Sequence, residues 1–195
     1  FGDANSGGHW GPELKFAGFD AIVVYGRSEK PVYLWIEDGK AEIKDAENLW
    51  RKTTYEVDDA LKEKHGADVK VASIGPAGEN LVRFACIMND RDRSASRSGM
   101  GAVMGSKRLK AIAIRGTKDI EIADVEHYLD VVKEWHKKML AHPYTENRAR
   151  YGTPLLIELM HEIGRLPTYN LRQGVFDDYE KIGGETIEKN YSIKH

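Results

Sequence analysis

Runs of apolar and β-branched residues, bounded by glycine, proline or charged residues, dominate the first part of the chain. Runs of this length and composition favour buried strands over helices. Strands are predicted at residues 20–26, 31–36, 41–43, 69–74, 82–88 and 109–114. Between the second and third of these, Asp38 and Gly39 tolerate the positive φ values of a tight turn, which predicts a hairpin.

Few helices separate these strands. Residues 12–17 suit a short helix, because proline stands in its first turn and glycine follows its end. Thr53 or Thr54 can cap a second helix at residues 55–64, and a third is expected at residues 99–104 after a long polar loop. Strands with so few helices between them indicate the α+β class rather than a doubly wound α/β fold.

After Ile122 the spacing of apolar residues becomes helical. Asp124 is a suitable N-cap for a helix at residues 125–141, and Pro143 is expected to end it. Shorter helices are predicted at residues 155–163 and 185–189. We therefore predict two domains, a mainly β sheet domain at residues 1–122 and the beginning of an α-helical domain at residues 123–195.

Charge and cysteine content exclude several classes of protein. The chain has 29 Lys and Arg against 31 Asp and Glu, a formal net charge of −2, so neither nucleic acid nor a membrane surface is an expected partner. Its apolar runs are far shorter than the roughly 20 residues that span a bilayer. A single cysteine builds neither a disulfide framework nor a cysteine metal site. A chain without disulfides fits the reducing environment of the cytoplasm. Because the chain begins with Phe1, we expect an internal segment of a longer protein.

Two loops have the composition of a ligand site. In the first, Asn5-Ser6-Gly7-Gly8, small residues allow backbone N–H and C=O groups to face a phosphate or a metal ion. The second, residues 90–101, holds three arginines and three serines ahead of the third predicted helix. Arginine donors and a helix N-terminus both suit phosphate. The alternative interpretation is a solvated turn and a charged surface loop, and composition alone does not decide between them.

The other residues that could carry chemistry are better explained by structural roles. Residues 75–78 follow a strand but lack the dinucleotide fingerprint and the lysine of a P-loop. His9 and His161 have no metal ligand at a suitable spacing, and Cys86 lies in an apolar run. No Ser/His/Asp arrangement or pair of carboxylates stands out, so no catalytic residue is expected in this chain.

Four blocks of sequence carry a resemblance to a known family. They are residues 4–8 with 11–22, residues 72–82, residues 87–90, and residues 101–107 with 109–113. In this order they closely resemble the aldehyde:ferredoxin oxidoreductase family of tungsten-pterin enzymes. The resemblance implies an internal fragment that spans much of the N-terminal domain and the start of the helical domain that bears the iron–sulfur cluster.

The resemblance also implies a cofactor site. In that family two molybdopterin dithiolenes hold one tungsten, and Mg²⁺ bridges their phosphates through backbone carbonyls. Carried over by position, the two magnesium-binding carbonyls belong to Asn5 and Ser94. The expected cofactor-binding residues are Asn5, Ser6, Gly7, Gly8, Arg93, Ser94, Ala95 and Ser96. Tungsten and molybdenum are not distinguished by the sequence.

The parent enzyme implied by the resemblance oxidises a small aldehyde with water to a carboxylic acid. It passes electrons through a [4Fe–4S] cluster to ferredoxin or a ferredoxin-like subunit. The cluster ligands lie outside this chain, so it is not expected to be active alone, and a homodimer is left open. Two alternatives remain: a tungsten subunit acting on another substrate, such as in aromatic-ring thioester reduction, and a non-catalytic phosphate- or nucleotide-binding module.

Overall fold

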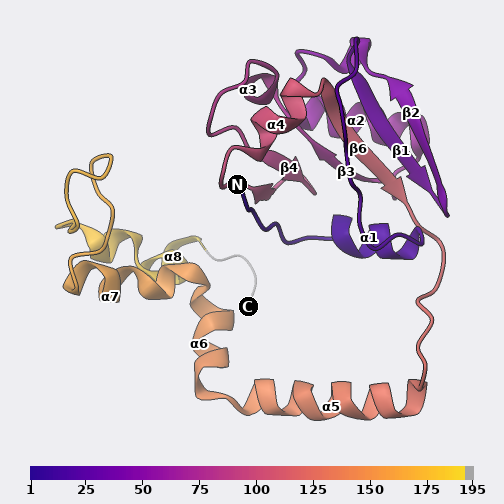
Figure 1. Ribbon diagram of the computed structural model, residues 1–195. Helices are drawn as coiled ribbons and strands as arrows, with labels where there is room; N and C mark the ends of the chain where they lie inside the picture. Colours follow the sequence, from indigo (N-terminus) through magenta and orange to yellow (C-terminus); the bar gives the residue numbers. More distant parts are fainter. Residues whose placement is uncertain (192–195) are drawn as a thin grey trace. The chain divides into compact units, whose positions relative to one another are not determined.

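The computed structural model describes residues 1–191 and divides into two compact units (Figure 1). The first unit, Phe1–Glu121, is built on one mixed sheet with the strand order β2-β1-β6-β3-β4-β5. β1 and β6 run parallel, and every other neighbouring pair in this sheet is antiparallel. The strands are β1 (Val32–Glu37), β2 (Lys40–Asp45), β3 (Lys70–Ser73), β4 (Ile87–Asn89), β5 (Arg93–Ala95) and β6 (Leu109–Arg115).

The helices of the first unit lie between these strands in the sequence. They are α1 (Trp10–Phe16), the 3₁₀ turn η1 (Glu47–Leu49), α2 (Thr54–His65), α3 (Pro76–Glu79) and α4 (Met100–Ser106). Thr53 caps α2 through a capping box with Glu56, as the threonine pair predicted. A mixed sheet with these helices confirms the α+β class.

Side chains of β1 alternate between two cores, as the two-residue period of a strand requires. Tyr33 and Trp35 pack in the cluster that contains Leu61 of α2. Ile36, on the opposite face of the strand, packs with Leu14 of α1. A large side chain buried in this way contributes about 1.5–3 kcal/mol. Both faces of β1 are therefore covered, which explains its nearly continuous apolar sequence.

The hairpin predicted at Asp38 and Gly39 is confirmed. Both residues have positive φ, 42° and 92°, and β1 pairs with β2 up to Glu37 and Lys40 on either side of the turn. The strand predicted at residues 20–26 is wrong, because that run lies along no other strand among residues 1–191. A strand forms only where a neighbour accepts its backbone hydrogen bonds, and apolar composition does not supply that neighbour.

Three smaller predictions also need correction. The strand predicted at residues 82–88 is confined to β4, and residues 75–78, for which no helix was predicted, contribute to the short helix α3. The long polar loop after Met88 is largely a hairpin, in which Asn89 pairs with Arg93. Strands with two or three pairing residues, and a helix of four residues, leave too little periodicity to be seen in sequence.

The second unit, Ile122–His195, is helical over the part that the structure describes. Asp124 accepts a hydrogen bond from the His127 N–H and caps its first helix, as predicted. Pro143 does more than end that helix, because it also opens the next one from the first turn. The elements are α5 (Val125–Ala141), α6 (Pro143–Tyr151), η2 (Thr153–Leu156), α7 (Ile157–Glu162), η3 (Tyr179–Ile182) and α8 (Gly184–Tyr191).

No helix within residues 1–191 combines the length and apolarity needed to cross a membrane. The predicted roles of the two domains, cofactor binding for residues 1–122 and cluster binding for residues 123–195, stay predictions at this point.

Candidate functional site

The two loops singled out in the sequence lie against each other in the first unit. At one end, the Ser98 hydroxyl accepts from the Asp3 N–H at 3.1 Å and donates to the Asp3 carbonyl at 2.9 Å. At the other end, the His9 N–H donates to the carboxylate of Asp90. The N-terminal segment therefore runs beside β4, as Figure 1 also shows. Folding brings together segments that are 81 to 95 residues apart in the sequence.

Asn89, the last residue of β4, joins the middle of the first loop to the hairpin. Its side-chain Nδ2 donates to the Gly7 carbonyl at 2.9 Å, and its Oδ1 accepts from the Ser6 hydroxyl. Only 6% of Asn89 is exposed. Asn89 stands in one of the family blocks and Asp90 at the start of the second loop, but neither was predicted as a cofactor-binding residue, because partners so distant in the sequence leave no mark on local spacing.

The first loop has open backbone on its remaining side. Asn5 is exposed, and neither its backbone nor its side chain makes a hydrogen bond with another residue in the described part of the chain. Space is open beside the Cα of Gly7. Gly8 has a φ of +98°, and a Cβ there would lie 2.2 Å from Oδ2 of Asp90. Glycine suits this position because of its positive φ, and a side chain there would also displace the Asp90 carboxylate.

The three arginines of the second loop have different surroundings. Arg91 donates to Asp58 at 3.1 Å and to Asp59, so it ties the turn between β4 and β5 to α2. The Asp58 hydrogen bond raises the pKa of Arg91. Arg93 and Arg97 are exposed and form no ion pair with any of residues 1–191. These two guanidinium groups remain available to an anion.

The serines of the second loop differ as well. The Ser94 side-chain oxygen is buried and has no hydrogen-bond partner among the described residues. Buried hydroxyl groups without a partner are rare in proteins and call for an explanation, such as a group that the chain alone does not contain. Ala95 is partly buried beside it, Ser96 is exposed, and Ser98 holds Asp3 as described above.

The start of α4 is less available than the sequence suggested. The helix begins at Met100, and the Gly101 N–H donates to the Ala85 carbonyl at 2.9 Å. That bond removes an amide group that a helix N-terminus would otherwise offer to a phosphate. The anion-binding potential of this loop therefore rests on arginine side chains and strand backbone.

The other sequence candidates have structural contacts. His161 stacks on Tyr179 with ring centroids 4.1 Å apart and accepts from the Phe176 N–H. The Cys86 thiol lies 3.7 Å from the Met88 sulfur. His9 is exposed. Among residues 1–191, no group of three or more His, Cys, Asp or Glu residues is placed to hold a metal ion.

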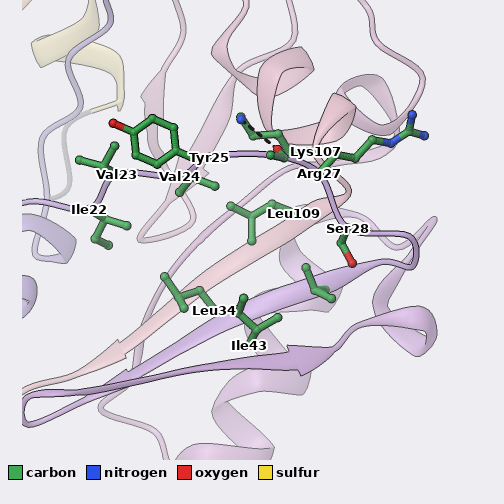
Figure 2. A pocket seen from close by; sticks show the side chains of 12 residues that line it. Ile22, Val23, Val24, Tyr25, Arg27, Ser28, Leu34, Ile43, Lys107 and Leu109 are labelled. Atoms are coloured by element: carbon green, nitrogen blue, oxygen red, sulfur yellow. Dashed lines mark hydrogen bonds between the residues drawn. The ribbon is translucent and has the colours of Figure 1, made fainter.

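A pocket of about 480 Å³ lies elsewhere in the unit, between residues 22–28 and the sheet (Figure 2). Figure 2 shows Leu34, Ile43 and Leu109 beneath this segment. Few polar groups line this pocket, and one of them, the Lys107 ammonium, already donates to the Gly26 carbonyl at 3.1 Å. An apolar hollow of this kind does not suit a phosphate-bearing cofactor, so the two loops are the better candidate site.

Two family models match the chain. The model described as "Aldehyde ferredoxin oxidoreductase, N-terminal domain" matches residues 1–116, and "Aldehyde ferredoxin oxidoreductase, domains 2 & 3" matches residues 130–195. A tungsten-containing aldehyde ferredoxin oxidoreductase of Thermococcus kodakarensis is 50% identical over 194 residues, which cover 98% of this chain and 32% of that protein. The chain thus spans about a third of the length of this curated relative.

More distant relatives have other names. An aliphatic sulfonate oxidoreductase, WOR-like subunit, of Pyrococcus furiosus is 37% identical over 145 residues, covering 67% of this chain and 23% of that protein. Among solved structures, the active site complex BamBC of benzoyl coenzyme A reductase with 1,5-dienoyl-CoA is similar, with a TM-score of 0.67 and 41% identity. That match covers 78% of this chain and 22% of the other.

Proposed function

Because the chain belongs to the aldehyde ferredoxin oxidoreductase family, we propose that its first unit cradles the pterin phosphates of a tungsten cofactor. The named relatives that match nearly all of this chain are tungsten-containing oxidoreductases. The observation that carries the proposal is the meeting of the two loops. It brings onto one part of the unit backbone groups, arginines and a buried hydroxyl that have no partner among residues 1–191.

The residues present fit such a cofactor. Carbonyl oxygens of Asn5 and Ser94 would bind Mg²⁺, a hard cation that prefers oxygen ligands and phosphate partners. Asn5 is exposed and free of hydrogen bonds to the other described residues, as a backbone ligand requires. The Arg93 guanidinium would pair with phosphate through charge-assisted hydrogen bonds. The rest of the cradle consists of Ser6, Gly7, Gly8, Ala95 and Ser96.

The chemistry of the reaction belongs to the cofactor. When bound, a tungsten or molybdenum bis-molybdopterin would supply two-electron oxidation and reduction, and a [4Fe–4S] cluster with ligands outside this chain would supply one-electron transfer to ferredoxin or a ferredoxin-like subunit. Residues of this chain bind and orient the pterin phosphates. The whole protein would thereby oxidise a small aldehyde with water to a carboxylic acid in the cytoplasm, and the segment alone would be inactive.

The second unit would begin the helical domain that bears the iron–sulfur cluster. The match of residues 130–195 to the model for domains 2 and 3 supports this assignment. We retain the predicted domain division at residues 1–122 and 123–195. It falls between β6, the last strand of the sheet, and α5, the first helix of the second unit. A homodimer of the whole protein belongs to the same proposal.

A second candidate substrate class follows from the structural comparison. The similar solved structure is a reductase of an aromatic-ring thioester, and another relative is named for aliphatic sulfonates. The cofactor-binding unit is therefore compatible with several reactions. The higher identity to aldehyde ferredoxin oxidoreductases, 50% against 41% and 37%, favours the aldehyde reaction.

Metal and pterin analysis of the whole protein, purified without oxygen, tests the proposal. We expect tungsten or molybdenum together with pterin, magnesium and iron, and aldehyde-dependent reduction of a viologen dye. Metal with pterin but activity only on a thioester or a sulfonate would select the second candidate. Bound nucleotide without pterin or metal would select a non-catalytic phosphate-binding module and contradict the proposal.

A further inference from the structure

We propose that Asn89 is a positioning residue that holds the first loop, residues 5–8, at a fixed place beside the β4–β5 hairpin. The proposal rests on the proposed function only in its consequence for the cofactor. The structural part stands on contacts within the first unit.

Both ends of the Asn89 amide group are bonded to the first loop. Nδ2 donates to the Gly7 carbonyl at 2.9 Å, and Oδ1 accepts from the Ser6 hydroxyl. Asn89 is only 6% exposed, although its partners Ser6 and Gly7 are exposed, so its amide group is held in one place by these two bonds. Because an amide donates at one end and accepts at the other, no other side chain of this size satisfies both partners. The backbone of Asn89 is itself placed by β4, which pairs with β5 at Arg93 and with β3 at Ala72.

Asp90 adds a second tie, so that the loop is held at more than one point. Its carboxylate accepts the His9 N–H, and the missing side chain of Gly8 leaves room for that carboxylate. The ties from Asn89 and Asp90 fall on residues 6 to 9, and Ser98 holds Asp3 on the other side, whereas Asn5 makes no hydrogen bond to the other described residues. The segment is therefore held on both sides of Asn5 and open at Asn5 itself.

This arrangement links the two predicted cofactor segments directly. Asn89 and Arg93 are cross-strand partners, so the residue that holds the first loop is paired with the arginine expected to bind phosphate. Loosening Asn89 would let Asn5 move relative to Arg93 and Ser94. A cofactor that bridges both segments would then lose one of its two supports.

Replacement by aspartate tests the proposal with little change of shape. Asn89→Asp keeps an acceptor for the Ser6 hydroxyl but places an anion against the Gly7 carbonyl. Asn80→Asp is the matched control, because the Asn80 amide also donates to a carbonyl, that of Pro76 at 2.8 Å, but only within its own turn. Ser6→Ala, at an exposed position, removes the hydroxyl that bonds to Asn89 and covers the case in which Asn89→Asp fails to fold.

Hydrogen–deuterium exchange of residues 1–9 in the whole protein is the primary measurement. Loss of one net hydrogen bond corresponds to about fivefold faster exchange at the His9 amide, and we expect at least that in Asn89→Asp. A smaller increase is expected in Ser6→Ala and none in Asn80→Asp. Unchanged exchange in both Asn89→Asp and Ser6→Ala would overturn the proposal.

Tungsten and pterin content of the same preparations separates this proposal from the proposed function. Faster exchange together with lower cofactor content supports both. Faster exchange with full cofactor content supports the holding role of Asn89 and overturns the assignment of the first loop to the cofactor.

Discussion

The Arg91 guanidinium donates to the buried carboxylate of Asp58 across 3.1 Å, whereas Arg93, two residues further on, forms no ion pair with the described residues. Two arginines of one hairpin therefore have different roles. Arg91 ties the hairpin to α2, whereas the exposed Arg93 is the residue proposed to bind phosphate. The two residues should respond differently to substitution.

Arg93→Ala in the whole protein should lower tungsten and pterin occupancy. Charge-assisted hydrogen bonds to a phosphate are worth about 1.5–3 kcal/mol, and alanine removes them. Arg93→Lys should recover only part, because a point charge does not replace the planar fork. Metal analysis after anaerobic purification measures the effect. Arg27→Ala is the control, an exposed arginine of the same unit at the apolar pocket; equal occupancy in all three variants would contradict the assignment.

Arg91→Ala should destabilise the first unit. Asp58 is 4% exposed and keeps Lys62 as a partner at 2.8 Å, so we expect a loss of stability that is smaller than the full cost of a buried unpaired charge. Urea unfolding followed by tryptophan fluorescence measures it. Lys30→Ala removes an exposed pair with Glu47 and should change stability by less than about 0.5 kcal/mol. Equal effects of the two variants would show that the Arg91 contacts do not stabilise the fold.

Lys110→Met should be among the most destabilising single changes in this unit. Lys110 is fully buried and bonded to Glu79, which is also buried, and its ammonium donates to the Lys52 carbonyl at 2.8 Å. Burial lowers the pKa of Lys110. Leaving Glu79 without this partner should cost about 3–5 kcal/mol.

The double variant Lys110→Met/Glu79→Gln is the informative comparison. Glutamine keeps an acceptor for the Arg51 N–H, which Glu79 now accepts at 2.9 Å, and carries no charge. We therefore expect the double variant to be more stable than Lys110→Met alone, by urea unfolding. If the loss of stability in the double variant equals the sum of the losses in Lys110→Met and Glu79→Gln, the two side chains are not coupled. That result would contradict a buried ion pair whose members depend on each other.

Gly105→Ala should destabilise the packing of α4 against α3, because a Cβ at Gly105 would lie 1.9 Å from the Gly78 carbonyl oxygen. Backbone must move to relieve this overlap, at a cost of about 2–3 kcal/mol. Gly11→Ala in α1 is the control with the opposite sign, since nothing lies within 4 Å and alanine favours helix by up to about 0.5–1 kcal/mol. Thermal unfolding that ranks the two variants the other way would refute the close contact.

Acidification should weaken the first unit through His65. Its ring stacks on Trp35 with centroids 3.9 Å apart, and burial, followed by the charges of Lys64 and Lys44, lowers its pKa below 6.5. The unfolded chain then binds a proton more readily than the folded one. The His65 contribution is therefore full above about pH 6.5 and is lost as the pH falls through the lower pKa of the folded state.

His65→Phe keeps an aromatic ring against Trp35 without a titrating group. Between pH 8 and pH 5.5, the melting temperature of the unsubstituted protein should fall more than that of the variant. Identical pH dependence would show that His65 does not contribute in this range.

Local sequence determined a large part of this fold. Thr53 and Asp124 as helix caps, the turn at Asp38 and Gly39, and the α+β class were all predicted, because each depends on residues near one another in the chain. The family resemblance, confirmed by both family models, also depends on short ordered blocks.

Only the tertiary structure decides which strands pair with one another and which polar residues are in contact. Residues 20–26 have strand composition but no pairing strand among residues 1–191, and the loop after Met88 became a hairpin. The bonds of Asn89 to the first loop and of Arg91 to α2 join residues 32 to 83 positions apart. Such contacts follow from the register and order of the strands, so no local pattern of apolar and polar residues predicts them.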